Sequence, residues 1–328
     1  MFTMEKGKFL IDNTPQADVS DGITFICTFS RRIMVPFFFR AFNKMSMPRS
    51  KIHLIVYDNT DDTLLATALI EEVNKVRDKF LSVRLYKSYL PGKGNILGSG
   101  NEQFKASKLF NIWKMWLSMR EMIKTDTFFV LEDDTIAPPD AFQRLYKLLL
   151  SHKGIGFATA IETGRTTYPW VPVRLGVHKL KMRGLKVIER RSFSPFTRGV
   201  KEIDCAGVYC FAARTKAYLS GFRGYDPINL KVPFFALDNV LTYNMKRHGW
   251  KLLADFDCWC SHLQASSARI IAFGKNQAVE MADLWIEKYH NYASGLEILP
   301  KNAKPRRYRV RRAAPSWELE PEIKEEKK

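Results

Sequence analysis

Acidic residues directly follow two apolar runs of the sequence, and this placement is the first sign of chemistry. Asp58 follows the run HLIVY, and the triplet Glu132-Asp133-Asp134 follows TFFVL. In an open parallel sheet, ligands bind outside the carboxyl ends of the strands. Carboxylates gathered there raise one another's pKa unless a cation neutralises them. Their oxygens suit Mg²⁺ or Mn²⁺ bridging phosphates, although an aspartate of the triplet can also cap the next helix.

The elements that would position these acids alternate along the first two thirds of the chain, which is typical of βαβ units on a mainly parallel sheet. We expect strands and helices in turn at 23–29, 36–45, 53–57, 62–79, 83–86, 104–123 and 127–131. Further strands are expected at 156–161 and 207–212, and a helix at 238–248 that Gly249 closes. The basic stretch between those strands lacks clear periodicity and is expected to be a functional loop.

The order of five motifs resembles glycosyltransferase family 2 and its relatives with the GT-A fold. These motifs are CTFSRR, VYDNTDD, FFVLEDD, DCAGVYCFAAR and FALDNVLTYNMKRHGWKLLADFDCWCSH, and they span residues 22 to 262. The resemblance implies an α/β nucleotide-diphospho-sugar transferase fold with a mainly parallel central sheet, flanking helices and a C-terminal helical extension. It also implies a metal-dependent hexosyl- or pentosyltransferase that moves a sugar from a nucleotide-sugar donor to an acceptor hydroxyl.

The resemblance assigns residues to the donor site. It implies that Thr28 and Arg31 hold the nucleotide base and that Asp58 contacts the base or ribose. The family's DxD motif matches Glu132-Asp133-Asp134, in which the first two acids lie at the nucleotide and Asp134 is the direct metal ligand. Glu132 replaces the family's first aspartate and has a longer side chain.

Two further residues follow from the same resemblance. His262 matches a histidine that reaches back to the metal, and imidazole suits Mn²⁺, although a histidine near Trp259 can also be a core side chain. Asp238 matches the general base of the family, while Leu237 replaces its usual acidic neighbour. A carboxylate there can take the proton of the acceptor hydroxyl, which predicts inversion at the anomeric carbon. Asp238 can equally act as the helix N-cap.

The charge of the chain bears on the acceptor. There are 52 Lys and Arg against 34 Asp and Glu, a net charge of +18 that favours polyanions or anionic membranes. Positive charge is concentrated at residues 165–201 and 301–312. In the first stretch, cations and rings suit a nucleic-acid strand, and the acceptor candidates are Arg165, Tyr168, Trp170, Arg190 and Arg191.

Two acceptor classes and one non-catalytic function remain open from the sequence. The leading hypothesis is a modified DNA or RNA base, as in viral DNA hypermodification. The alternative is a cell-envelope or lipid-linked saccharide, with the enzyme docked on an anionic membrane. A third possibility, from another class, is an inactive GT-A-like module that binds polyanions.

The domain organisation expected from the sequence has four parts. These are an N-terminal extension (1–21), a catalytic domain (22–262, with a donor half at about 22–140 and an acceptor half at about 150–262), a helical extension (263–300) and a flexible tail (301–328). No run approaches the about 20 apolar residues of a membrane span, and no signal-like start is present. We therefore expect a cytoplasmic protein, in the host cytoplasm if it is viral, or one peripheral to a membrane. Its five cysteines are expected to be reduced and buried.

Overall fold

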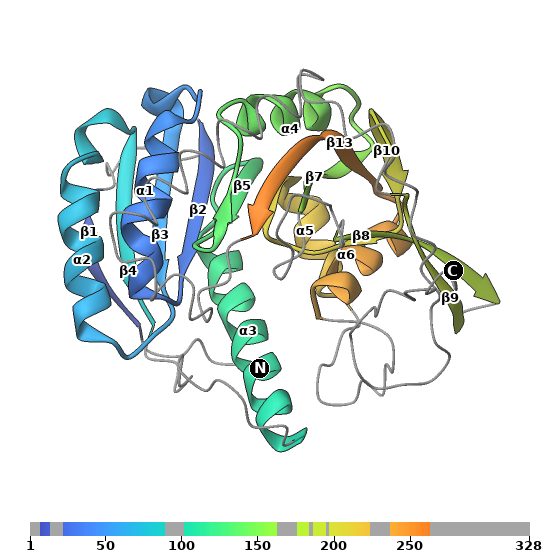
Figure 1. Cartoon of the computed structure of the whole chain (residues 1–328), viewed down its shortest axis with the longest axis horizontal. Coiled ribbons are helices and arrows are strands. Elements are labelled where there is room, and N and C mark those ends of the chain that lie inside the picture. Colours follow the sequence, from blue (N-terminus) through green and yellow to red (C-terminus); the bar gives the residue numbers. More distant parts are fainter. Residues whose placement is uncertain are drawn as a thin grey trace, which may run out of the picture.

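A computed structural model describes residues 7–13, 22–88, 102–162, 176–183, 186–194, 197–223 and 237–262. This part of the chain forms an α/β fold around one large sheet (Figure 1). The strands of that sheet are β1 (Lys8–Asp12), β2 (Ile23–Phe29), β3 (Ile52–Asp58), β4 (Ser82–Lys87), β5 (Thr127–Glu132), β6 (Thr135–Ile136), β7 (Ile155–Glu162), β10 (Val200–Ile203), β12 (Cys210–Arg214) and β13 (Lys251–His262). The helices are α1 (Val35–Lys44), α2 (Thr63–Asn74), α3 (Glu102–Met122), α4 (Ala141–Leu150), α5 (Thr215–Gly221) and α6 (Leu237–Arg247).

The sheet order is β1-β4-β3-β2-β5-β12-β7-β13-β10, and β6 pairs with the end of β13. The strands β4, β3, β2 and β5 are parallel to one another, and β7 is parallel to β13. Between these groups lies β12, antiparallel to both β5 and β7. Two antiparallel steps restore the original direction, so all of these parallel strands have their carboxyl ends at one edge. The predicted architecture, a mainly parallel sheet flanked by helices, is confirmed.

Helices cover both faces of the sheet because its strands are apolar on both sides. One core contains Phe25 of β2 together with residues of α1, α2 and α4, such as Phe38, Leu69 and Phe142. The other contains Ile26 of β2 and residues of α3, α5 and α6. The alternation of Phe25 and Ile26 between the two cores follows from the two-residue repeat of a strand.

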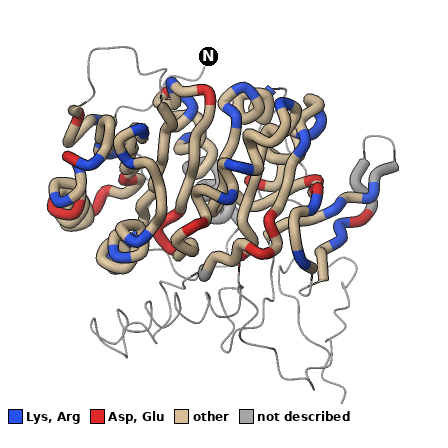
Figure 2. Tube along the Cα trace, turned by 90° about the horizontal axis from the view of Figure 1, so that it is seen from above, with Lys and Arg blue, Asp and Glu red and all other residues tan. Residues whose placement is uncertain are grey.

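Residues 176–203 correct one expectation from the sequence. This basic stretch contains β8 (Val177–Arg183) and β9 (Lys186–Ser192), which form a hairpin, and β10, so the prediction of a loop is wrong for its described part. A small second sheet joins the hairpin to β11 (Cys205–Ala206) in the order β11-β8-β9. The hairpin projects from the body of the protein (Figures 1 and 2). Charged side chains lie opposite one another across the hairpin, as at Lys181 and Glu189. The two strands therefore lack the alternation of apolar and polar residues by which a strand is normally predicted.

Several smaller expectations also have outcomes. All five cysteines are buried and free, as predicted. None of the described helices is long and apolar enough to cross a membrane. Within the expected N-terminal extension, β1 pairs with β4 at the sheet edge. The expected helical extension and the tail lie outside the described residues.

Candidate active site

The carboxyl ends of the central strands bring the predicted donor residues together. Thr28 of β2 is in register with Glu132 of β5, and Phe29 is in register with Asp58 of β3. The turn after β5 is fixed on both sides, because the Asp133 amide donates to the Thr28 carbonyl at 3.0 Å and the Glu132 amide donates to the Tyr209 carbonyl at 2.9 Å. This backbone pairing places the acidic triplet between β2 and the chain that enters β12.

Asp133 and Asp134 are buried and share one guanidinium nitrogen. Arg31 Nη1 lies 2.7 Å from Asp133 Oδ1 and 2.9 Å from Asp134 Oδ2. The other oxygen of Asp133 accepts a hydrogen bond from the Ser30 amide at 2.8 Å. Burial raises the pKa of Asp133 to about 6, against the lowering effect of Arg31 and with a further rise caused by Asp134. The triplet is therefore a concentration of negative charge that one arginine partly neutralises.

Asp58 is held inside the protein in the described structure. Lys87 Nζ at the end of β4 donates to Asp58 Oδ2 at 2.8 Å. The Thr60 amide and hydroxyl donate to Asp58 Oδ1 at 2.9 and 2.8 Å. Burial raises the pKa of Asp58, whereas the bonds from Lys87 and Thr60 lower it. Both carboxylate oxygens are thus engaged, and the contact with the base or ribose implied for Asp58 stays a prediction.

The surroundings of Asp134 fit a divalent cation in chemistry and position. Asp134 supplies carboxylate oxygen, and the buried Thr135 hydroxyl oxygen beside it has no hydrogen-bond partner among the described residues. The pairing of β6 with β13 sets His262 opposite Thr135, so the backbone brings His262 next to Asp134. The structure does not describe the side chain of His262. Among the side chains that it describes, no three His, Cys, Asp or Glu residues are close enough together to hold a metal ion. Diphosphate oxygens or water would complete the coordination.

Asp238 lies in the first turn of α6, close to the chain that leads into β12. It is the second residue of the helix, so it lies within the first turn rather than before it. The Asn239 amide donates to Asp238 Oδ1 at 2.9 Å. A Cβ atom at Gly207 would lie 3.3 Å from Asp238 Oδ2, so the backbone before β12 passes close to this carboxylate. The hydroxyl of Thr242 accepts from the Ala206 amide at 2.9 Å and joins α6 to β11.

Two charged residues influence the Asp238 carboxyl group. Its pKa is raised to about 6, mainly because surrounding protein removes water from it. The negative charge of Glu162 raises this pKa further, and the positive charge of Arg190 lowers it. Glu162 ends β7 and was missed by the sequence analysis. Its signal was available, because Glu162 follows an expected strand as Asp58 and Glu132 do.

The structure separates the acceptor candidates Arg190 and Arg191, which are adjacent on β9. In the hairpin register, Arg190 is opposite Leu180 and Arg191 is opposite Lys179, so the two arginines point to opposite faces. Arg190 is half-buried and acts on the charge of Asp238, whereas Arg191 is exposed and forms two hydrogen bonds with Glu189. The other candidates, Arg165, Tyr168 and Trp170, lie outside the described residues.

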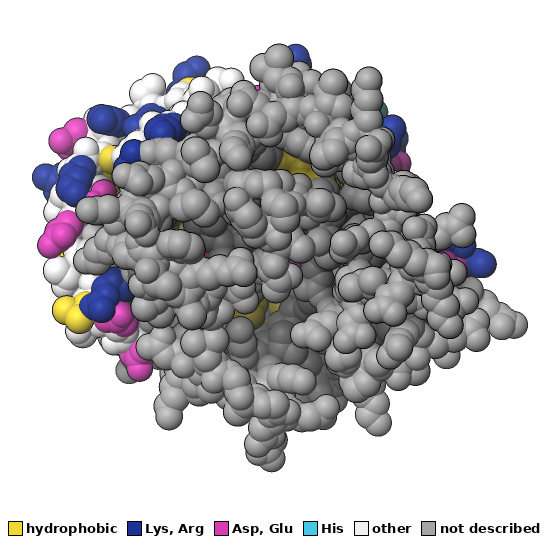
Figure 3. Space-filling model, viewed as in Figure 1, with side chains coloured by type: hydrophobic (Ala, Val, Ile, Leu, Met, Phe, Trp, Pro, Cys, Tyr) yellow, Lys and Arg dark blue, Asp and Glu magenta, His cyan; other side chains and the backbone are white. Residues whose placement is uncertain are grey.

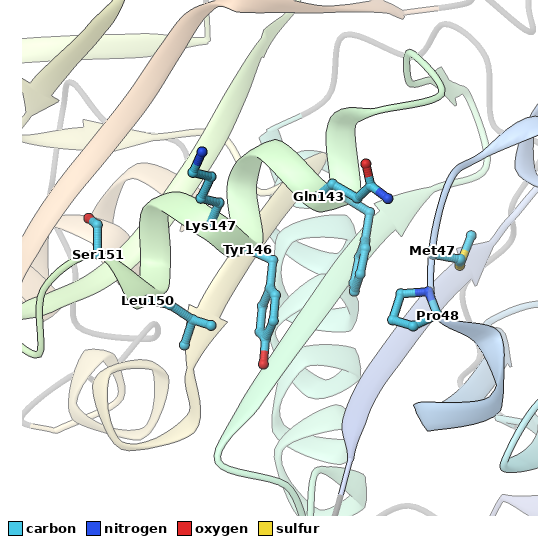
Figure 4. A pocket seen from close by; sticks show the side chains of 8 residues that line it. Met47, Pro48, Gln143, Tyr146, Lys147, Leu150 and Ser151 are labelled. Atoms are coloured by element: carbon cyan, nitrogen blue, oxygen red, sulfur yellow. The ribbon is translucent and has the colours of Figure 1, made fainter.

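A separate hollow lies away from this edge, against the outer side of α4 (Figure 4). It has a volume of about 790 Å³ and a mainly apolar lining that includes Met47, Pro48, Tyr146 and Leu150. None of the predicted site residues lines it. The hollow is therefore not part of the candidate active site.

No protein-family model and no curated protein match the chain. Its fold resembles that of the mannosyltransferase PcManGT from Pyrobaculum calidifontis, solved with GDP-Man and Mn²⁺, at 12% identity and a TM-score of 0.48, over 87% of this chain and 75% of that one. It resembles S. aureus TarS 1–349 at 10% sequence identity and a TM-score of 0.44, over 74% of this chain and 60% of that one. It resembles GalNAc-T7, solved with UDP, GalNAc and Mn²⁺, at 12% sequence identity and a TM-score of 0.49, over 83% of this chain and 49% of that one. The chain thus spans less than two thirds of the last two, and likeness at this level carries no conclusion about function.

Proposed function

We propose that this protein is a metal-dependent glycosyltransferase of the GT-A type that moves a sugar from a nucleotide-sugar donor to an acceptor hydroxyl. The observation that carries the proposal is the meeting of the acidic triplet and the helix of Asp238 at one sheet edge. A cavity of about 10 Å³, room for one water molecule, is lined by Thr28 and Glu132 and also by Val208 and Leu241. The link between the triplet and α6 is the turn before β12, because the Glu132 amide donates to the Tyr209 carbonyl at 2.9 Å and a Cβ atom at Gly207 would lie 3.3 Å from Asp238 Oδ2.

We assign the roles of the residues as the family resemblance implies them. Asp134 and His262 would hold the metal, which when bound neutralises the diphosphate leaving group. The residues that would orient the nucleotide are Thr28, Arg31, Asp58, Glu132 and Asp133. Asp238 takes the proton of the acceptor hydroxyl, and its raised pKa makes it a stronger base than an ordinary aspartate. Attack on the anomeric carbon from the face opposite the nucleotide inverts its configuration.

For the acceptor we propose a nucleic-acid base, of the kind modified in viral DNA hypermodification. The net charge of +18 and the projecting basic hairpin support a polyanionic acceptor. Arg190 places one of these cations close enough to act on Asp238. A saccharide of the cell envelope on an anionic membrane is the alternative that the same charges would serve.

The decisive experiment measures nucleotide release from a panel of UDP-, GDP- and TDP-sugars with Mn²⁺, with and without DNA. We expect metal-dependent release by the wild type, stimulation by DNA, and loss of release in Asp134→Ala. The control variant is Asp78→Ala, since the side chain of Asp78 is 89% exposed and lies outside the site.

The outcomes separate the alternatives. Release that is indifferent to DNA would keep the transferase and favour an envelope or protein acceptor. No release from any donor would contradict the transferase and favour a polyanion-binding module.

A further inference from the structure

Arg31 stands between two buried carboxylates and the solvent. The side chains of Asp133 and Asp134 are 3% and 2% exposed, whereas that of Arg31 is 29% exposed. A single nitrogen, Nη1, contacts both acids at 2.7 and 2.9 Å. Arg31 is therefore a partly exposed cation in direct contact with both buried acids.

The charges around this contact indicate competition. Arg31 supplies one positive charge to a turn with three carboxylates, two of which its guanidinium contacts directly. A divalent cation at Asp134 would add two positive charges beside the guanidinium, and like charges at this separation repel. A nucleoside diphosphate brings negative charge that can accommodate both cations.

The local backbone lets Arg31 leave without dismantling the turn. Arg31 has an extended conformation just before a short 3-10 helix (Arg32–Met34), and its side chain caps nothing there. Asp133 also accepts a hydrogen bond from the Ser30 amide at 2.8 Å, a backbone contact that does not involve the Arg31 side chain. The acids thus have a side-chain partner, the Arg31 guanidinium, and a backbone partner, the Ser30 amide.

We propose that Arg31 is an internal cation that competes with the divalent metal for Asp134, so that the metal binds weakly alone and tightly together with a nucleoside diphosphate. This inference rests on the proposed function, because it concerns the same metal site. It assigns to Arg31 a role in the order of binding, in addition to any contact with the nucleotide base.

The test is the dissociation constant of Mn²⁺, measured by calorimetry without nucleotide and with UDP or GDP. For Arg31→Gln without nucleotide we expect this constant to fall by about 10- to 100-fold, the worth of one lost charge-assisted contact. The strengthening of Mn²⁺ binding by UDP or GDP should shrink accordingly. Arg31→Lys keeps a charge but lacks the forked guanidinium, so its constant should be intermediate.

The matched control is Arg32→Gln, which removes the same charge at an exposed neighbouring position and should leave Mn²⁺ affinity as in the wild type. Melting temperatures show whether each variant is folded, and Arg31→Lys serves if Arg31→Gln is not. Unchanged or weaker Mn²⁺ binding in the Arg31 variants would overturn the inference while leaving the transferase intact. Absence of Mn²⁺ binding in every variant, with and without nucleotide, would contradict the metal dependence of the proposed function as well.

Discussion

Asp238 has a different electrostatic environment from the acids of the triplet. It is partly buried, and the surrounding protein removes enough water from its carboxyl group to raise the pKa to about 6. Glu162 and Arg190 act on this pKa in opposite directions. The residue proposed as base is therefore tuned by two neighbours that come from distant parts of the chain.

This tuning predicts the pH dependence of the reaction. The carboxylate is the active form of Asp238, so kcat/KM should fall about tenfold per pH unit below a pKa of about 6. Glu162→Gln removes a charge that raises this pKa, so the fall should move to lower pH. Arg190→Ala removes a charge that lowers it, so the fall should move to higher pH.

The measurement is a pH profile of kcat/KM for each variant. Arg191→Ala is the control, because this arginine is exposed and is paired with Glu189. An unshifted profile in both Glu162→Gln and Arg190→Ala would mean that Asp238 does not set the acid limb. A shift in Arg191→Ala equal to that of Arg190→Ala would indicate an effect of net charge only.

At the scale of elements, the ends of β3 and β4 are joined by a buried ion pair. The side chains of Asp58 and Lys87 are 0% and 7% exposed, and Lys87 also donates to the Asp62 carbonyl at 3.1 Å. Asp62 caps α2, since its side chain accepts from the Leu64 and Leu65 amides. One lysine thus connects two strands and the start of a helix beside the proposed donor site.

Removal of this lysine should destabilise the fold. Lys87→Met leaves the Asp58 carboxylate buried without its cation, which costs about 3–5 kcal/mol when one partner of a buried pair is lost. The free energy of unfolding in urea measures this. Lys75→Met is the control, because Lys75 is exposed and pairs with Glu72 at the surface of α2, where we expect no measurable change. Equal stability of both variants would show that the Lys87 pair is dispensable.

At the scale of the whole molecule, positive charge is widely spread. On the face shown in Figure 3, the described Lys and Arg side chains gather at the margin that carries α1 and α2, with acidic side chains among them. On the hairpin, the exposed cations Lys181 and Arg191 lie on the same face. Arg191 is paired with Lys179, and Lys181 is two residues from Lys179 along the same strand, so its side chain points the same way. The α1 and α2 margin and this face of the hairpin are therefore two separate surfaces with exposed cations, and their contributions to binding of a polyanion can be compared.

The proposed acceptor predicts binding of single-stranded DNA that depends on both salt and the hairpin. The affinity should fall by about 10³-fold between 50 and 200 mM salt if about six phosphates are contacted. The double variant Lys181→Gln with Arg191→Gln should bind more weakly and with a smaller salt dependence, as measured by fluorescence anisotropy. The control, Lys75→Gln with Lys79→Gln, removes the same charge from the other surface. An equal loss in both would point to net charge alone, and binding only to anionic vesicles would favour the membrane alternative.

The sequence by itself determined the parts of this protein that depend on neighbours along the chain. The strands that end at Asp58 and Glu132 and the helix that begins at Leu237 all lie within a few residues of their predicted positions. Apolar runs and the polar residues that end them are local signals, because a strand or helix buries its own face with a fixed repeat. The metal and base roles of Asp134, His262 and Asp238 remain predictions from the family resemblance.

Only the tertiary structure decided which of these residues meet. The contact of Arg31 with Asp133 and Asp134, and the effect of Glu162 and Arg190 on Asp238, join segments of more than 40 residues apart in the chain. Such contacts depend on strand order, above all on β12 lying between β5 and β7, and on the hairpin that the sequence concealed behind its charges. Strand order is set by packing of the whole sheet, so no local pattern of residues encodes it.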